Sequence, residues 1–131
     1  MLGSETPGIS SPLISPDGSR AVFQWRKDIE RKPANGLWII RTSDGSHKLL
    51  CSGLWTPLQW SADGKRIFLS DSARTSIYTV TSTGGEPKLF VNLGMGFIAT
   101  ADISEDGSTI VAEIRDDVAD VWLIQLTDTE K

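Results

Sequence analysis

The chain has 131 residues, which is enough for one domain of ordinary size or for part of a larger one. Apolar residues make up 39% and charged residues 23%, a globular composition that excludes a wholly disordered chain. Thirteen Lys and Arg against seventeen Asp and Glu give a net charge of −4, which argues against a nucleic-acid binder. The one cysteine excludes an internal disulfide, and with one histidine it supplies too few ligands for a zinc site.

An internal repeat organises the chain. The turn motif Ser-x-Asp-Gly occurs three times, at a period of about 40 to 50 residues, and a β-rich apolar run follows each copy. The repeated aspartates are Asp17, Asp63 and Asp106. A second apolar run follows in each unit, with one aromatic residue at its centre: Trp38, Tyr78 and Trp122. Asp-Gly and Gly-Gly turns supply the positive φ that β-hairpins need, so each unit reads as a small antiparallel sheet.

This pattern predicts an all-β fold built from β-propeller blades, each a four-stranded antiparallel unit. The strands are predicted at 10–14, 20–25, 36–41 and 47–51, then at 57–60, 65–70, 75–80 and 87–91, and finally at 99–103, 108–114 and 119–126. The three blades therefore span about 10–51, 55–91 and 97–126, between an N-terminal extension at 1–9 and a C-terminal tail at 127–131. The last blade is incomplete, because it lacks its fourth strand.

The segments SPDGSRAVF, LWIIRTSDGSHKLL, LQWSADGKRIFLS and IYTVTSTGGEPKLF resemble the WD-repeat-like propeller repeats of the TolB-like family, over about residues 10–126. Similar repeats occur in the propellers of prolyl-oligopeptidase-type peptidases and on some bacterial sensor proteins. The resemblance implies a bacterial, non-enzymatic scaffold for protein–protein interaction, like the C-terminal part of an extracytoplasmic or sensor propeller. The alternative it implies is the gating propeller of a serine peptidase whose catalytic domain is not in this chain. A third reading is a self-assembling propeller that binds glycans.

Three blades leave two terminal faces and one strand edge uncovered, which favours association. We therefore expect either the remainder of a larger propeller or a homo-oligomer to close the ring, and not a well-behaved monomer. Residues 1–10 lack the features of a signal peptide, and no apolar run is long enough for a membrane helix, so no membrane insertion is expected. This chain alone fits the cytoplasm, whereas a fragment of a longer protein fits the periplasm or another extracytoplasmic compartment.

Candidate binding residues lie on one rim of the predicted blades. Tight turns fall on one side, here called the turn rim, and the longer segments 26–35, 52–56, 71–75, 92–97 and 115–119 fall on the other, here called the loop rim. Loops on a rigid scaffold commonly carry function, so the loop rim is the candidate binding face. Its candidate residues are Arg26, Lys27, Arg31, Lys32, Trp55, Arg74, Phe97, Asp116 and Asp117. The competing interpretation is a set of solvated loops, with the two aromatic residues packed beneath them.

The residue patterns that carry chemistry favour structural roles. Recurrence in every unit indicates that the three aspartates cap turns and that the three central aromatics fill the blade core. The acidic residues at 116, 117 and 120 fit no calcium loop, although carboxylates can hold hard cations. His47 lies in a hairpin, Cys51 has no conspicuous base nearby, and G-x-S-x-G is absent. No phosphate-binding glycine motif is present either. The sequence therefore predicts no catalytic residue, no cofactor and no metal.

Overall fold

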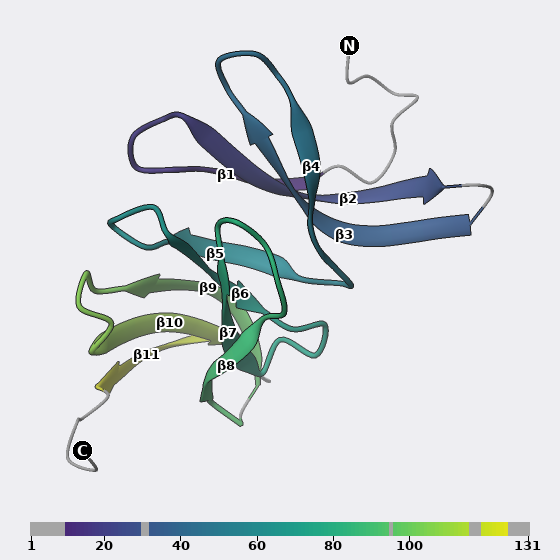
Figure 1. Ribbon diagram of the computed structural model, residues 1–131. Helices are drawn as coiled ribbons and strands as arrows, with labels where there is room; N and C mark the ends of the chain where they lie inside the picture. The colour runs from purple at the N-terminus through teal and green to yellow at the C-terminus, as the bar shows by residue number, and fades with distance from the viewer. Residues whose placement is uncertain (1–9, 30–31, 95, 116–118, 126–131) are drawn as a thin grey trace.

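The computed structural model describes residues 10–29, 32–94, 96–115 and 119–125, which form three antiparallel sheets (Figure 1). The first sheet contains β1 (Ser10–Ile14), β2 (Arg20–Ile29), β3 (Lys32–Arg41) and β4 (His47–Ser52). The second contains β5 (Thr56–Trp60), β6 (Arg66–Ser70), β7 (Ser76–Thr81) and β8 (Lys88–Asn92). The third contains β9 (Phe97–Ile103), β10 (Thr109–Arg115) and β11 (Ala119–Gln125). A membrane-crossing helix is absent from this described part of the chain.

The strands follow one another in each sheet in the order of the sequence, as the repeat predicts. The first hairpin of every sheet turns at the Ser-x-Asp-Gly motif, where the glycine φ lies between 73° and 77°. In each motif the glycine N–H donates to the serine carbonyl at 2.9 Å. An L-residue with a side chain is strained at such φ values, so glycine fits this place in the turn. All three of these turns lie on the left in Figure 1.

The predicted loop at 26–35 is wrong, because β2 and β3 continue as a paired hairpin. Arg26 pairs with Asn35, and Ile29 pairs with Lys32. Strand pairing here needs only backbone hydrogen bonds between neighbouring segments, whereas the sequence prediction relied on an alternating apolar face that this charged segment lacks. Arg26 and Lys27 therefore lie in β2 and Lys32 lies in β3, while Arg31 lies outside the described residues.

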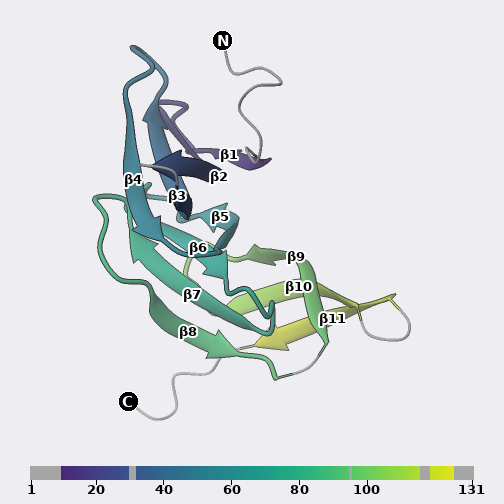
Figure 2. The same cartoon turned by 90° about the vertical axis from the view of Figure 1, so that its right-hand side faces the viewer.

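Figure 2 shows the three sheets following one another, and two apolar layers of side chains hold them together. The first layer lies between the first and second sheets, with Leu37, Ile67 and Leu69 fully buried in it. The second layer lies between the second and third sheets, with Ile77 and Ile98 fully buried. Each sheet is thus buried by the next one, which is how propeller blades stabilise one another.

Polar side chains bridge the sheets along their first strands, β1, β5 and β9, which lie next to one another. The Trp60 Nε1–H in β5 donates to the Leu13 carbonyl in β1 at 2.8 Å. The Gln59 amide in β5 makes two hydrogen bonds with the backbone of Ile103 in β9, one donated and one accepted, both 2.7 Å long. These bonds fix the positions of neighbouring sheets relative to one another.

An aromatic cluster lies on the face of the first sheet that points away from the second. Phe23, Trp25 and Trp38 form it, and each is at most 8% exposed. The second sheet carries Leu69 and Tyr78 at the corresponding repeat positions, on the face that the first sheet covers. The first sheet thus repeats, on its far face, the apolar pattern that a preceding blade would cover.

Candidate functional site

The repeated aspartates hold the turns. Asp106 accepts hydrogen bonds from the Ser108 N–H at 3.0 Å and from the Ser104 and Ser108 hydroxyls at 2.8 Å. Asp17 accepts the equivalent three bonds from Ser15 and Ser19. The Ser19 N–H and its hydroxyl, then Ser15, lower the pKa of Asp17 to about 2, and the Ser108 and Ser104 bonds lower that of Asp106 to about 2. The bonds that lower the pKa of Asp63 come from the Ser61 hydroxyl and the Lys65 N–H.

The aspartates of these turns make the stability of the folded chain depend on pH in the acidic range. The folded pKa values of Asp17 and Asp106 lie near 2, below their ordinary value of 3.8. The hydrogen bonds therefore stabilise the folded chain above about pH 4, and this contribution is lost as the pH falls to about 2. We expect a double variant, Asp17→Asn with Asp106→Asn, to lose less of its melting temperature over that interval than the native chain does. Thermal melts followed by circular dichroism across the interval test this, and parallel curves would contradict it.

Trp55 lies at the loop rim between the first and second sheets. Its ring packs on the apolar layer between these sheets and meets Tyr78 edge-on, with 5.0 Å between ring centroids. Its Nε1–H donates to the Ser52 carbonyl at 3.0 Å. The ring is therefore held by both sheets and remains only partly buried, so it can present one side to a ligand without moving.

Arg74 and Phe97 lie in contact with each other, where the second sheet packs on the third. The Arg74 Nε–H donates to the Ile98 carbonyl at 2.8 Å, and its Nη2 donates to the Ala99 carbonyl at 3.0 Å. Its guanidinium carbon lies 4.6 Å from the centre of the Phe97 ring, at a distance typical of a cation–π contact. Burial lowers the pKa of Arg74. The guanidinium is therefore engaged by β9, and Phe97, the first residue of β9, is 43% exposed.

The remaining predicted residues lie at the C-terminal end of the third sheet or outside the described residues. Asp116 and Asp117 lie outside the described residues, so the acidic cluster remains a prediction. Trp122 lies in β11, where it pairs with Ala112. Within the described ranges, no three acidic, histidine or cysteine side chains gather as metal ligands.

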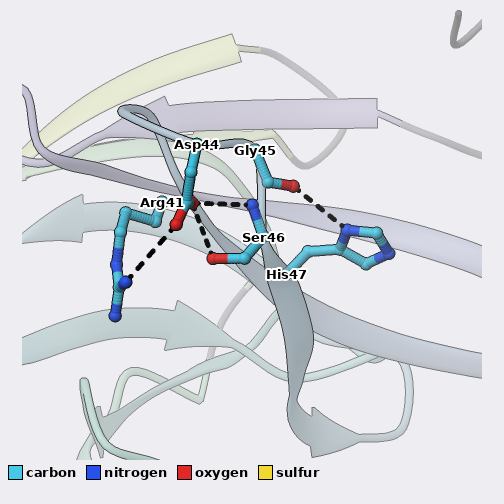
Figure 3. A network of polar contacts seen from close by, with 5 residues as sticks. All are labelled: Arg41, Asp44, Gly45, Ser46 and His47. Carbon is cyan, nitrogen blue, oxygen red and sulfur yellow. Dashed lines mark hydrogen bonds and ion pairs between the residues drawn. The ribbon is translucent and has the colours of Figure 1, made fainter.

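The histidine and the cysteine both take part in packing. The His47 ring lies 5.6 Å from the ring of Trp25 and 5.8 Å from that of Trp38, centroid to centroid. Its Nδ1 lies 3.4 Å from the Gly45 carbonyl oxygen, and Figure 3 shows this nitrogen facing that oxygen. Cys51 is 7% exposed in the layer between the first two sheets, and burial raises the pKa of its thiol to about 11. Such a thiol is a poor nucleophile at neutral pH.

A pocket opens on the loop rim beside Trp55. Its volume is about 300 Å³. Its lining carries no charged side chain and consists of Gln24, Trp25, Asn35, Gly36, Gly53, Leu54 and Trp55. The Gln24 amide is already engaged, because its Nε2 donates to the Trp55 carbonyl at 2.7 Å. Leu54 is 58% exposed at the edge of the pocket. Of these residues, only Trp55 was predicted from the sequence as a binding residue, because the connection at 52–56 resembles four other loops of the chain.

Comparison with known proteins places the fold. No family model matches the chain. A protein described as TolB from Agrobacterium tumefaciens has a TM-score of 0.68 and 22% identity, over 89% of this chain and 43% of that one. Pyrococcus horikoshii acylaminoacyl peptidase has a TM-score of 0.61 and 19% identity, over 95% of this chain and 24% of that one. Oligogalacturonate lyase from Vibrio parahaemolyticus has a TM-score of 0.68 and 8% identity, over 100% of this chain and 39% of that one.

At these identities the likeness shows the fold alone. The predicted all-β class and TolB-like propeller fold are confirmed, and the chain spans less than half the length of each of the three proteins. Two of these three are enzymes by their names, so the fold by itself does not decide the activity. The chain is a set of consecutive antiparallel sheets with the fold of a partial TolB-like β-propeller.

Proposed function

We propose that the chain is a non-enzymatic β-propeller module that binds a protein partner through the pocket beside Trp55. The observation that supports this proposal most directly is the uncharged pocket at the loop rim, which has Trp25 and Trp55 in its lining and an exposed leucine at its edge. The partner group that fits is an apolar side chain, flanked by a backbone that can meet the Asn35 amide. In the whole protein these sheets would form part of a longer propeller, or of a ring assembled from several copies.

Three features of the pocket support protein binding. The partly exposed ring of Trp55 offers apolar area in a fixed position, and tryptophans often dominate the energy of protein interfaces. Trp55 is fixed by Ser52 and Tyr78 before any partner arrives, so little side-chain freedom is lost on binding. An exposed leucine beside it gains from being covered, because its apolar area is in water in the free chain.

A peptide selection tests this proposal. Random peptides displayed on phage are selected against the whole chain, and the tightest is titrated while tryptophan fluorescence is followed. We expect the selected peptides to share an aromatic or aliphatic residue. We expect Leu54→Ala to weaken the selected peptide about five- to tenfold, because the variant removes exposed apolar area at the pocket edge.

The matched control is Leu89→Ala. Leu54 and Leu89 are each 58% exposed, but Leu89 lies in β8, away from the pocket. We expect Leu89→Ala to leave the affinity unchanged. If Leu54→Ala binds the peptide as tightly as the native chain, or if Leu89→Ala weakens it equally, the pocket is not the binding site.

The second candidate is the gating propeller of a prolyl-oligopeptidase-type peptidase. The similarity in fold to acylaminoacyl peptidase favours this role. The matched part is 24% of that protein, so a propeller like this one would be a small part of a longer peptidase chain. A G-x-S-x-G segment encoded downstream in the same gene would support this role. In that case the loop rim would face a hydrolase domain instead of a separate partner.

A further inference from the structure

A second opening lies between the first and second sheets, on the turn rim. It is a cleft of about 400 Å³. Its lining residues are Arg20, Ile39, Ile40, Arg41, Ser46, His47, Lys48, Ser82 and Thr83. Three of these side chains are permanent cations and none is a carboxylate, whereas the lining of the pocket beside Trp55 has no charge at all. The cleft is also of the size in which small molecules bind.

The strand register brings these cations together. Arg20 in β2 pairs directly with Arg41 in β3, so the two side chains share one face of the sheet. Lys48 in β4 pairs with Ile39, two residues before Arg41, and therefore lies on that same face. The face is the one that carries Val22 and Leu37 against the second sheet, whose Ser82 and Thr83 close the other side of the cleft.

Like charges directly opposite one another destabilise an antiparallel pair. The other sheets avoid this arrangement at the equivalent place, because Arg66 pairs with Thr81 in the second sheet. In the third sheet Thr109 pairs with Gln125. Of the three described sheets, only the first places two arginines opposite each other at this position. A bound anion would relieve the repulsion between their charges.

The partners that these cations have in the free chain leave donors available. Arg20 donates one bond, from Nη2 to the Gly64 carbonyl at 2.8 Å, and its guanidinium has five N–H groups in all. Arg41 lies 3.5 Å from Asp44, and both of these side chains are more than half exposed. Figure 3 shows Asp44 also receiving the N–H and hydroxyl of Ser46. Exposed ion pairs of this kind are weak, so a multiply charged ligand can compete with Asp44 for Arg41.

We propose that this cleft binds a small molecule that carries a phosphate group. Two arginine forks and a lysine suit a dianion with several acceptor oxygens, which a single carboxylate would not satisfy. The hydroxyl of Ser82 adds a neutral donor from the second sheet, whereas the hydroxyl of Thr83 lies 3.1 Å from that of Thr81. His47 also lines the cleft, but its ring packs on Trp25 and Trp38, so we do not count it among the phosphate ligands. The site is independent of the pocket beside Trp55, since the two have no lining residue in common.

The test uses the whole chain and glucose 6-phosphate, with glucose as the uncharged partner compound and sodium chloride to hold the ionic strength. Backbone amide resonances of Lys48, Ser82 and Thr83 are followed by NMR during each titration. We expect saturable shifts with glucose 6-phosphate and none with glucose. We expect Lys48→Met to weaken binding about tenfold, and Arg41→Lys to weaken it several-fold because the planar fork is lost although the charge remains.

The chain provides its own matched control. Lys88 is the repeat counterpart of Lys48, exposed at the start of β8, and it does not line the cleft. Lys88→Met therefore changes the net charge equally, and we expect less than about a twofold loss. Three results would overturn the proposal: no saturable shift, equal losses in the two methionine variants, or tighter binding of a glutamate-rich peptide than of the phosphate ester. The last would assign the cleft to an acidic protein segment.

Discussion

Replacing Ile67 with alanine is expected to lower the free energy of unfolding by about 2–5 kcal/mol. Ile67 has no exposed surface, and it lies in β6 within the layer between the first and second sheets. The variant loses the apolar transfer free energy of the removed methyl and methylene groups and leaves a cavity that the packed strands cannot fill. Denaturant unfolding of both chains at the same protein concentration measures the difference, since any assembly would make stability depend on concentration.

Val111→Ala is the control for this prediction. Val111 lies in β10 and is 42% exposed, on the face of the third sheet opposite to the buried Ile110. We expect this control to cost less than about 1 kcal/mol, because little apolar area is lost from a packed layer. If the two substitutions cost the same, the layer between the first two sheets does not hold the fold together.

Replacing Gln59 with leucine is expected to cost about 2–4 kcal/mol, because it leaves two backbone groups of Ile103 without their partner. Ile103 is 3% exposed, so water cannot easily replace the two 2.7 Å bonds that the Gln59 amide makes to its N–H and carbonyl. Hydrogen exchange gives a direct readout. The Ile103 amide is expected to exchange faster in the variant, whereas the amide of Val22 in the first sheet keeps its relative protection.

A second substitution separates shape from hydrogen bonding. Gln59→Glu keeps the size of the side chain but replaces its N–H donors with a carboxylate oxygen, which faces the Ile103 carbonyl. We expect it to be at least as destabilising at neutral pH as the leucine variant. Unchanged exchange at Ile103 in both variants would show that this bridge does not join the second and third sheets.

Most of the strand framework could be predicted from the sequence, because the Ser-x-Asp-Gly turns mark each first hairpin and the apolar runs alternate. The prediction failed at 26–35, where the strands pair without an apolar face. Phe97 was assigned to a connection and is the first residue of β9. Such boundaries depend on backbone pairing with another segment, which a local pattern does not report.

The candidate sites were harder to predict than the fold. Arg74 was selected as a candidate binding residue of the loop rim, but its guanidinium binds two carbonyls of the next sheet, a contact that requires the packing of two sheets. The Arg20–Arg41 pair was missed because the tight turns were treated as structural only. Aligning the two predicted strands as an antiparallel pair would have placed these arginines at the same end of the hairpin, where they lie opposite each other.

Chemical modification of Cys51 can report how the layer between the first two sheets opens. A thiol-directed reagent reacts with the thiolate, and this thiol is both covered and, with a pKa of about 11, almost wholly protonated at neutral pH. Labelling must therefore wait until the first sheet moves away from the second. Since this is the one cysteine in the chain, the rate of its modification reports the opening of this layer without any introduced probe: the opening rate when labelling outpaces reclosing, and the open population when reclosing is faster.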